Sequence, residues 1–535
     1  MRHHHSNPAT RPDGACLRRT ALPRRRAWPG GLVVGLALCA AASLAQPTAP
    51  ASATASAPAS AAASAPATAA ASAPAAAPVL HPDALRVIDL WLEAQRAYDR
   101  VPAVSAAVVV GQAVVYRRGF GHIDAARQVA ATPESIYSIC SISKLFTSVA
   151  AMQLWEQGKL PLDTDIGQLL PEFAIQRTDP DSGPITVRGL LTHASGLPRE
   201  ADAAYWTAPN FVFPDRATLL QSLRGQRTFM RAGDHHQYSN LGMALLGELV
   251  AAASGQPYAD HVQQHILTPL QMADTRTTLP QALLGQRLAQ GFGALQRDGQ
   301  RPVLASFDAR AMAPAAGFSS TVDDLARFAR WQLRLHAQGG QELLKLSTLR
   351  EMQRVHWTDP DGKTTWGLGF AVSTEGGQAI AAHSGWCPGY RSALAVMPGE
   401  QLAVATMTNV GDANGVVPYG RALRQLALKG LKLKTPAADA PAPRLTDYAG
   451  RYNPQPWASE LLVLPWGGSL AVLSLPSRDP AGDLEVLSPL GGDRFRYTRP
   501  DGTPSSEVLF ERDASGQVVA LREWGQRTPR VAVLP

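Results

Sequence analysis

Two groups of strand-like segments, far apart in the chain, constrain its fold more than any other feature. The first group is a hairpin over 104–121 with its turn at Gly111-Gln112. The second group consists of three apolar runs separated by Gly and Pro, at 378–386, 391–398 and 401–409. Helix-like and loop-like sequence fills the interval, and a further helix is expected over 83–98. Strands at both ends of a domain, with helices inserted, predict an α+β fold in which helices flank one antiparallel sheet.

A different pattern follows this region. Short alternating runs are punctuated by Gly, Pro and Asp, at 460–466, 469–475, 494–499 and 506–513. This pattern predicts a small all-β barrel or meander. Two segments, 46–80 and 435–444, are rich in Ala and Pro and contain almost no large apolar side chains. We expect the first to be a disordered linker and the second to be a linker between domains. The predicted domains are therefore 81–434 and 445–535.

The N-terminal segment has the pattern of a secretory signal peptide. Seven arginines within 1–26 precede an apolar run over 31–45 that ends in small residues. This run of 15 residues is short for a membrane-spanning helix, which needs roughly 20. We therefore expect a signal peptide over 1–45 and a periplasmic or secreted protein, with no stable membrane anchor once the signal is removed. The sequence does not distinguish the general export route from the twin-arginine route.

Charge and motif content exclude several classes of function. The formal charge is +7, but residues 1–26 contribute seven arginines and one aspartate, so the remainder is nearly neutral. No block of Lys and Arg follows Arg26, which argues against a nucleic acid partner. The sequence has no phosphate-binding glycine loop and no metal-ligand spacing, and the pair His235-His236 has no third ligand nearby. We therefore expect no cofactor and no metal ion.

A serine and a lysine lie where a helix is expected to begin. Apolar residues recur after Ser141 at helical spacing, at Ile142, Leu145, Phe146, Val149 and Met152. Lys144 then lies one turn after Ser141 on the same face, and Gly158 is placed to end the helix. A lysine acts as a base only where burial or a neighbouring positive charge lowers its pKa from ~10.4. The alternative is that Ser141 only caps the helix and that Lys144 is solvated.

Two further polar groups lie downstream. Tyr238 and Asn240 occupy a polar turn ahead of a second expected helix. A phenol beside a lysine can share its proton, and an asparagine can hold a substrate amide. His383, Ser384 and Gly385 lie on a strand that ends in a Pro-Gly turn, where the glycine lets another backbone approach closely. The alternative for His383 is a strand histidine with only a structural role.

The three motifs, Ser-x-x-Lys, Tyr-x-Asn and His-x-Gly, occur in this order. On them the chain resembles the penicillin-recognising serine hydrolases, specifically the branch of class C β-lactamases, D-alanyl-D-alanine carboxypeptidases, D-aminopeptidases and related esterases. Supporting similarities lie at 191–198, 269–275, 317–331 and 366–370. The C-terminal unit resembles the lipocalin-like barrel often appended to this branch. The resemblance implies a β-lactamase/transpeptidase-like domain, with an antiparallel sheet flanked by helices and a helical subdomain, followed by a small all-β barrel.

The resemblance also implies a role for each motif residue. Ser141 would attack a carbonyl and form an acyl-enzyme, while Lys144 and Tyr238 together would take and return the proton. The backbone N–H groups of Ser141 and Trp386 would form the oxyanion hole. The residues that the resemblance assigns to substrate binding are Asn240, His383, Ser384, Gly385 and Trp386. His193 lies in a loop that is structural in the family, and we expect the same here.

The chain differs from class C β-lactamases at His383, and it carries a pair of cysteines close to the motifs. Class C β-lactamases carry lysine where this chain has His383, and a histidine is mostly neutral at pH 7. Peptidase and aminopeptidase members carry histidine there. Cys140 and Cys387 are the cysteines that remain after signal removal, and they resemble a bridged pair in some class A carbapenem-hydrolysing enzymes. The resemblance implies a Cys140–Cys387 disulfide, against the alternative of two reduced thiols in the core.

The favoured hypothesis is an exported serine hydrolase that acts on small esters or on D-amino-acid or cell-wall peptide amides. The partner is then a small-molecule or peptide substrate. One alternative is a genuine β-lactamase that hydrolyses β-lactam antibiotics. The other is a non-catalytic relative that binds peptide or serves as a scaffold. The sequence gives neither the substrate, nor the role of the barrel, nor the oligomeric state.

Overall fold

The computed structural model describes residues 79–363, 365–412, 416–434, 444–499 and 501–534. The expected signal peptide, the linker up to residue 78 and the linker segment 435–443 lie outside the described residues. All described residues belong to one compact unit. None of the described helices combines the length and the apolar composition that crossing a membrane requires.

The hairpin and the three C-terminal runs form one antiparallel sheet, as predicted. Its strand order is β2-β1-β10-β9-β8-β7-β6-β5. The long strands are β1 (Ala103–Val110), β2 (Ala113–Gly121), β8 (Gln378–Cys387), β9 (Tyr390–Met397) and β10 (Leu402–Thr408). Three short strands extend the edge: β5 (Trp357–Thr358), β6 (Thr365–Trp366) and β7 (Ala371–Glu375). The hairpin joins the C-terminal group through β1 and β10, where Val104 pairs with Thr408.

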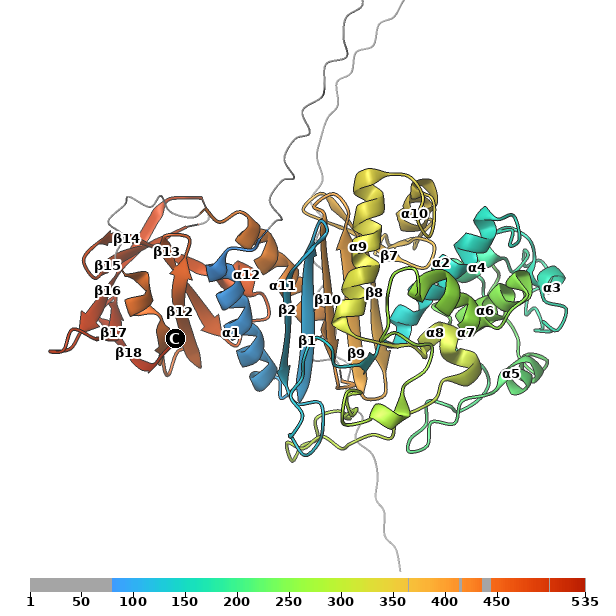
Figure 1. The fold of residues 1–535 in the computed structure, drawn as a ribbon, viewed down its shortest axis with the longest axis horizontal. Coiled ribbons are helices and arrows are strands. Elements are labelled where there is room, and N and C mark those ends of the chain that lie inside the picture. The colour runs from blue at the N-terminus through green and yellow to red at the C-terminus, as the bar shows by residue number, and fades with distance from the viewer. Residues whose placement is uncertain (1–78, 364, 413–415, 435–443, 500, 535) are drawn as a thin grey trace, which may run out of the picture. The chain divides into compact units, whose positions relative to one another are not determined.

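Helices cover both faces of the sheet at strand β1, so all residues of this strand are buried. Alternate side chains belong to different cores, because successive residues of a strand point to opposite faces. Ala107 and Val109 pack with the core that contains α9 (Val322–Gln338). Val104 and Val108 pack with α1 (Pro82–Tyr98) and α11 (Val416–Leu431) on the opposite face. The first domain is therefore layered as helices, sheet and helices (Figure 1).

A helical subdomain lies beyond the sheet on the α9 side. Its longest members are α2 (Ser143–Glu156) and α6 (Asn240–Ser254), which pack on each other. The shorter helices are α3 (Ile166–Leu169), α4 (Val187–Leu191), α5 (Arg216–Leu223), α7 (Tyr258–Val262), α8 (Ala313–Ala316) and α10 (Leu346–Gln353). A two-stranded sheet pairs β3 (Tyr137–Ser138) with β4 (Ser319–Ser320).

The helix expected to begin near Ser141 begins two residues later. A 3₁₀ turn over Cys140–Ile142, here called η1, precedes it, and Ser141 lies within this turn. The predicted apolar stripe is buried, but so is the rest of α2 as far as Leu154. The reason is that α2 is enclosed by α6, α8 and the η1 turn. Gly158 follows the helix with a φ of +71°, as expected of a residue that ends a helix.

The C-terminal segment forms a closed barrel, as predicted. Its strands are β11 (Gly450–Tyr452), β12 (Glu460–Trp466), β13 (Ser469–Leu475), β14 (Glu485–Gly491), β15 (Arg494–Thr498), β16 (Pro504–Arg512), β17 (Val518–Glu523) and β18 (Gln526–Val533). Helix α12 (Pro480–Asp483) lies between β13 and β14. Large side chains such as Tyr448, Phe495 and Phe510 form a core of their own. The barrel is therefore filled by its own side chains.

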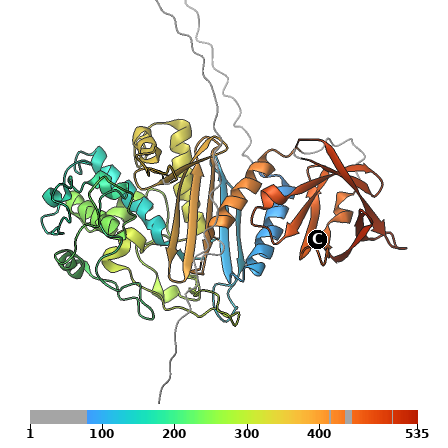
Figure 2. The same cartoon turned by 180° about the vertical axis from the view of Figure 1, so that it is seen from behind.

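The barrel contacts the first domain through α1. The Trp91 indole donates a hydrogen bond to the Ser477 carbonyl (2.9 Å), and the Ser477 N–H donates to Gln95 (2.9 Å). Apolar residues of the barrel, among them Leu462 and Leu473, share one core with α1 and α11. Both views show α1 between the sheet and the barrel (Figures 1 and 2). The barrel therefore packs on the first domain.

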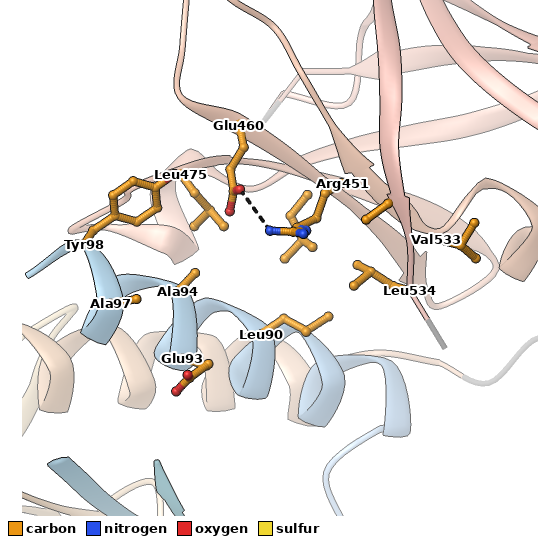
Figure 3. Close-up of a pocket in the computed structure, with 12 residues that line it drawn as sticks. Leu90, Glu93, Ala94, Ala97, Tyr98, Arg451, Glu460, Leu475, Val533 and Leu534 are labelled. Carbon is orange, nitrogen blue, oxygen red and sulfur yellow. Dashed lines mark ion pairs between the residues drawn. The ribbon is translucent and has the colours of Figure 1, made fainter. Parts of the chain in front are cut away.

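A cavity of about 630 Å³ lies between α1 and the barrel strands β11, β12, β13 and β18 (Figure 3). Its wall is mostly apolar, with Leu90, Leu475 and Leu534 among its lining residues. An ion pair lies in its barrel wall, between Arg451 of β11 and Glu460 of β12, with Arg451 Nη1 3.7 Å from Glu460 Oε2 (Figure 3). None of the predicted site residues lines this cavity.

Candidate active site

The turn that carries Ser141 is pressed closely against strand β8. Cys140 has a φ of +48°, in the left-handed region that non-glycine residues seldom adopt. A Cβ atom on Gly385 would lie 2.1 Å from the Ile139 carbonyl oxygen and 2.2 Å from Ser392 Oγ. Only glycine leaves room for this approach, which is the role predicted for it. A disulfide joins Cys140 to Cys387 of β8, with Cα atoms 5.7 Å apart.

Lys144 is fully buried beside the serine. Its Nζ lies 3.1 Å from Ser141 Oγ, 2.7 Å from Asn240 Oδ1 and 2.8 Å from the Ala315 carbonyl oxygen. Burial holds the pKa of Lys144 well below its usual value. The alternative of a solvated lysine is therefore wrong, and the pairing of Ser141 with Lys144 is the arrangement found.

The three partners of Lys144 suit a neutral amine. A neutral amine has two N–H donors and one lone pair. The Asn240 Oδ1 and Ala315 oxygens can only accept, so the two N–H groups are directed to them. The lone pair then faces the Ser141 hydroxyl, whose proton it can accept. The geometry therefore supplies a base in contact with a potential nucleophile.

Tyr238 lies beside both Ser141 and Lys144. Burial raises its pKa well above the usual value, against the opposite effect of its hydrogen bond with the Ser141 side chain. Lys144 Nζ lies 4.7 Å from the centre of its ring. The phenol is therefore neutral, with its hydroxyl at Ser141 and its ring beside the Lys144 amine, so it can pass a proton between the site and a bound substrate.

Asn240 is fixed at the start of α6. Ser239 caps this helix, because its hydroxyl accepts a hydrogen bond from the Gly242 N–H (2.8 Å). The Asn240 amide oxygen accepts from Lys144, and its Nδ2 donates to Glu200 Oε1 (2.7 Å). Asn240, predicted to bind a substrate amide, is thus also part of the support of Lys144.

His383 faces the same site from β8. Burial lowers its pKa to about 3, and the neighbouring Lys144 acts in the same direction. Its Nδ1 lies 2.8 Å from the Ser384 carbonyl oxygen, which can only accept, so Nδ1 carries the proton. The ring is therefore neutral at pH 7, as expected from the sequence.

A pocket of about 310 Å³ opens at the serine. Its lining comprises Ser141, Arg199, Tyr238, Trp366, Ala371, His383, Ser384 and Trp386. Four of these eight residues belong to the three motifs, and a fifth, Trp386, was predicted from the resemblance, so the three remote segments do converge. Lys144, Asn240 and Gly385 adjoin the pocket without lining it. The pairing of β7 with β8 ends where Ala371 meets Ala382, so among the described residues β8 has no paired neighbour on this side from His383 onward.

Trp386 follows Gly385 and lies at the rim of the pocket. Its side chain is 62% exposed. The indole Nε1 donates to the Gly411 carbonyl (2.5 Å), and the Arg391 guanidinium lies 4.3 Å from the centre of its ring. The Gly411 carbonyl and the Arg391 guanidinium therefore hold the indole in place. Its role as a backbone donor to an oxyanion stays a prediction.

The sequence did not identify Arg199 and Trp366 as site residues. Trp366 lies in the stretch 366–370, whose similarity to the family was the available signal. Its ring lies 5.6 Å from that of His383 and 5.1 Å from that of His193. Arg199 begins a loop that the sequence pattern does not place. Its guanidinium lies 5.1 Å from the centre of the Tyr238 ring.

Two other histidines form part of the wall behind Tyr238. The His193 ring is buried 4.3 Å from the Tyr238 ring, and its Nδ1 accepts a hydrogen bond from the Ser239 N–H (3.1 Å). This is a structural role at the edge of the site. His236 packs 5.2 Å from the Trp366 ring and is only partly exposed. No group of three or more His, Cys, Asp or Glu in the described ranges could hold a metal ion.

Comparisons with known proteins agree with this geometry. The model of the Beta-lactamase family matches residues 88–429, which is more than half of the chain. Penicillin-binding protein 4 of Amycolatopsis lactamdurans is 27% identical over 380 residues, covering 67% of this chain and 93% of that protein.

Two solved structures share the fold. The octameric penicillin-binding protein homologue from Pyrococcus abyssi has a TM-score of 0.56 and 22% identity over 82% of this chain and 98% of that chain. The Beta-lactamase/D-alanine carboxypeptidase from Yersinia pestis, complexed with citrate, has a TM-score of 0.55 and 22% identity over 65% of this chain and 99% of that chain. These two structures show the fold, and the match of the family model to residues 88–429 shows the family. The chain is a member of the Beta-lactamase family of serine hydrolases.

Proposed function

We propose that this chain is an exported serine hydrolase that works through an acyl-enzyme on Ser141. Its substrates are small esters or amides of D-amino acids and cell-wall peptides. One observation carries the proposal: the Lys144 amine is fully buried, its hydrogen-bond partners among the described residues are uncharged, and it lies 3.1 Å from the Ser141 hydroxyl.

The reaction has two halves. In the first, Ser141 Oγ attacks the substrate carbonyl carbon while its proton passes to the Lys144 amine. The tetrahedral intermediate collapses as the leaving group takes a proton from the Lys144–Tyr238 pair, which leaves an ester on Ser141. In the second half, water loses a proton to the same pair and attacks this ester. The acid departs, and Ser141 regains its proton.

The oxyanion of both halves needs hydrogen-bond donors. We assign the backbone N–H groups of Ser141 and Trp386 to this role. Losing one such donor commonly lowers the rate by a factor of ~10² to 10³. Because His383 is neutral, the β8 wall offers no permanent charge to the carboxylate of a β-lactam. This supports peptidase, amidase or esterase activity over efficient β-lactam turnover.

The names of similar proteins are consistent with this substrate class. One relative is named for penicillin binding, and one structure is described as a Beta-lactamase/D-alanine carboxypeptidase. Export is proposed from the signal-like segment 1–45. The Cys140–Cys387 disulfide is compatible with an oxidising compartment, so we place the mature protein in the periplasm or the medium.

A labelling experiment tests the acyl-enzyme. Purified protein is treated with a fluorescent fluorophosphonate and with a fluorescent penicillin, alongside the variant Ser141→Ala. We expect covalent label on the parent and none on the variant. Ser222→Ala provides a matched control, because this serine lies on α5 and its hydroxyl donates to the Leu219 carbonyl of the same helix. Equal labelling of the parent and Ser141→Ala would refute the assignment, and a parent that takes up no label would favour a non-catalytic relative.

A substrate panel tests the class. Initial rates are compared for p-nitrophenyl esters, D-alanine amides and nitrocefin. We expect ester or D-amide turnover to exceed nitrocefin turnover in kcat/KM. The reverse order would establish the β-lactamase alternative and would show that a neutral His383 suffices for β-lactam binding.

A further inference from the structure

Glu200 lies directly behind Asn240, on the loop between α4 and α5. Its carboxylate accepts hydrogen bonds from Asn240 Nδ2 (2.7 Å) and from the Tyr205 hydroxyl. The Arg199 guanidinium lies beside it, with Nε 3.3 Å from Glu200 Oε1. The carboxylate is therefore one residue removed from Lys144, through the Asn240 amide.

The loop holds Glu200 in this place from two sides. The Arg199 carbonyl accepts hydrogen bonds from the backbone N–H groups of Asn240 (2.7 Å) and Leu241 (3.2 Å). Tyr205 is buried, and its ring lies 4.9 Å from the Phe213 ring. The position of Glu200 is thus set by the start of α6 and by an aromatic cluster.

Glu200 determines which way the Asn240 amide points. The amide oxygen and nitrogen are nearly equal in size, so packing alone does not distinguish them. A carboxylate can only accept, so it binds the Nδ2 side and leaves Oδ1 to Lys144. A reversed amide would set its Oδ1 against the Glu200 carboxylate, where both groups can only accept. Its Nδ2 would then compete with the Ser141 hydroxyl for the lone pair of the Lys144 amine.

Glu200 also carries a charge close to the base. The groups that face Lys144 are Ser141 in η1, Tyr238 and Asn240 at the start of α6, the Ala315 carbonyl in α8, His383 in β8, His193 after α4, and the loop residues Arg199 and Glu200. Burial keeps both histidines neutral by lowering their pKa values. After burial, the largest influences on the pKa of Lys144 are Glu200, which raises it, and Arg199, which lowers it.

We propose that Glu200 is a positioning residue for the general base. It holds the Asn240 amide oxygen toward Lys144, and its charge, opposed by that of Arg199, sets the pH range in which the Lys144 amine is neutral. This inference rests on the proposed function, because it takes Lys144 as the base for Ser141.

The test compares four variants of the full chain on a p-nitrophenyl ester, as kcat and KM across pH. Glu200→Gln keeps an acceptor for Asn240 but removes the charge. Glu200→Ala removes both, and Arg199→Gln removes the opposing charge. Glu248→Gln is the matched control: it lies on α6 eight residues after Asn240, about 12 Å along the axis, and pairs with Arg216 (2.5 Å).

The variants should differ in kind. Glu200→Gln should move the acid limb of kcat/KM to lower pH by roughly one unit, because losing a nearby negative charge favours the neutral amine. Arg199→Gln should move it to higher pH by a smaller, salt-sensitive amount, since its side chain is 55% exposed. Glu200→Ala should lose roughly tenfold to a hundredfold in kcat with little change in KM. Glu248→Gln should match the parent.

Two outcomes would overturn the inference. A limb that stays in place, or moves to higher pH, in Glu200→Gln would refute the role of the charge. A Glu200→Ala variant with the parent's kcat would refute the role in orientation.

Failure of the proposed function is a separate result. It would appear as a parent enzyme with no Ser141-dependent turnover. In that case ¹³C NMR of Cε-labelled lysine gives the titration of Lys144 directly, because the chain has only seven lysines. The signal is assigned by its loss in Lys144→Met. A midpoint that is the same in the parent and Glu200→Gln would overturn the inference without reference to activity.

Discussion

The two faces of the central sheet are both buried, but their cores differ in chemistry. On the α1 and α11 side, Val104 and Val108 of β1 pack in an apolar core with residues such as Leu423. On the other side, the apolar core encloses Lys144 and His383, whose pKa values burial lowers. Burying such groups is unfavourable unless they are hydrogen-bonded. The apolar face therefore contributes mainly to stability. The other face buries Lys144 and His383 at a cost in stability, and this burial keeps both side chains neutral.

The largest expected effect is on the catalytic face. Lys144→Met keeps a long side chain but removes the base, so kcat/KM should fall by roughly 10² to 10⁴. Rates with a p-nitrophenyl ester, together with the unfolding midpoint, measure this. A variant that keeps its activity would show that another group deprotonates Ser141.

Next comes a substitution on the apolar face. Leu423→Ala leaves a cavity beneath α11, so the free energy of unfolding should fall by about 2 to 5 kcal/mol. The activity of the folded fraction should be unchanged. Urea unfolding and active-site titration separate the two quantities. If activity per folded molecule fell as well, the two faces would be coupled, and the comparison would fail.

Gly385→Ala addresses the contact between the sheet and the nucleophile turn. The added Cβ would meet the Ile139 carbonyl at 2.1 Å, so η1 must move away from β8. We expect a loss of stability of roughly 1 to 3 kcal/mol and a larger proportional loss of kcat. Ala379→Gly, at an exposed position of the same strand, controls for a general effect on β8. Equal kcat in Gly385→Ala and the parent would show that the turn tolerates displacement.

The smallest expected effect concerns the titration of His383. Because burial lowers its pKa to about 3, the ring is neutral throughout the range in which an ordinary histidine titrates. The profile of kcat/KM should therefore show no inflection from His383 between about pH 5 and 8. His383→Asn and the parent should give profiles of the same shape. An inflection that disappears in the variant would mean that the histidine is hydrated.

Much of the fold follows from local sequence patterns. The hairpin, the three C-terminal strands and the barrel were predictable because each strand carries its own alternation and its own Gly or Pro turn. The short strands β5 to β7 were not, since two or five residues carry too little pattern. Nor was the complete burial of α2, because periodicity reports one apolar face while neighbouring elements decide whether the others are covered.

The site divides in the same way. Ser141 and Tyr238 lie at element ends, and His383 lies on a strand that leads into a Pro-Gly turn, so a motif can mark all three. Arg199 and Glu200 lie on a loop whose path depends on contacts with α6 and on aromatic packing around Tyr205, and no periodicity reports such contacts. Both residues lie close to Lys144 in the folded chain but far from it in the sequence, so only the three-dimensional structure reveals their influence.

The contact of α1 with both the sheet and the barrel has a consequence for C-terminal truncation of this protein. Ending the product near residue 434 would leave Trp91 and the apolar residues around it facing water on one side. Such a fragment should expose an apolar surface and aggregate more readily than the whole protein, although every group around Ser141 would still be present.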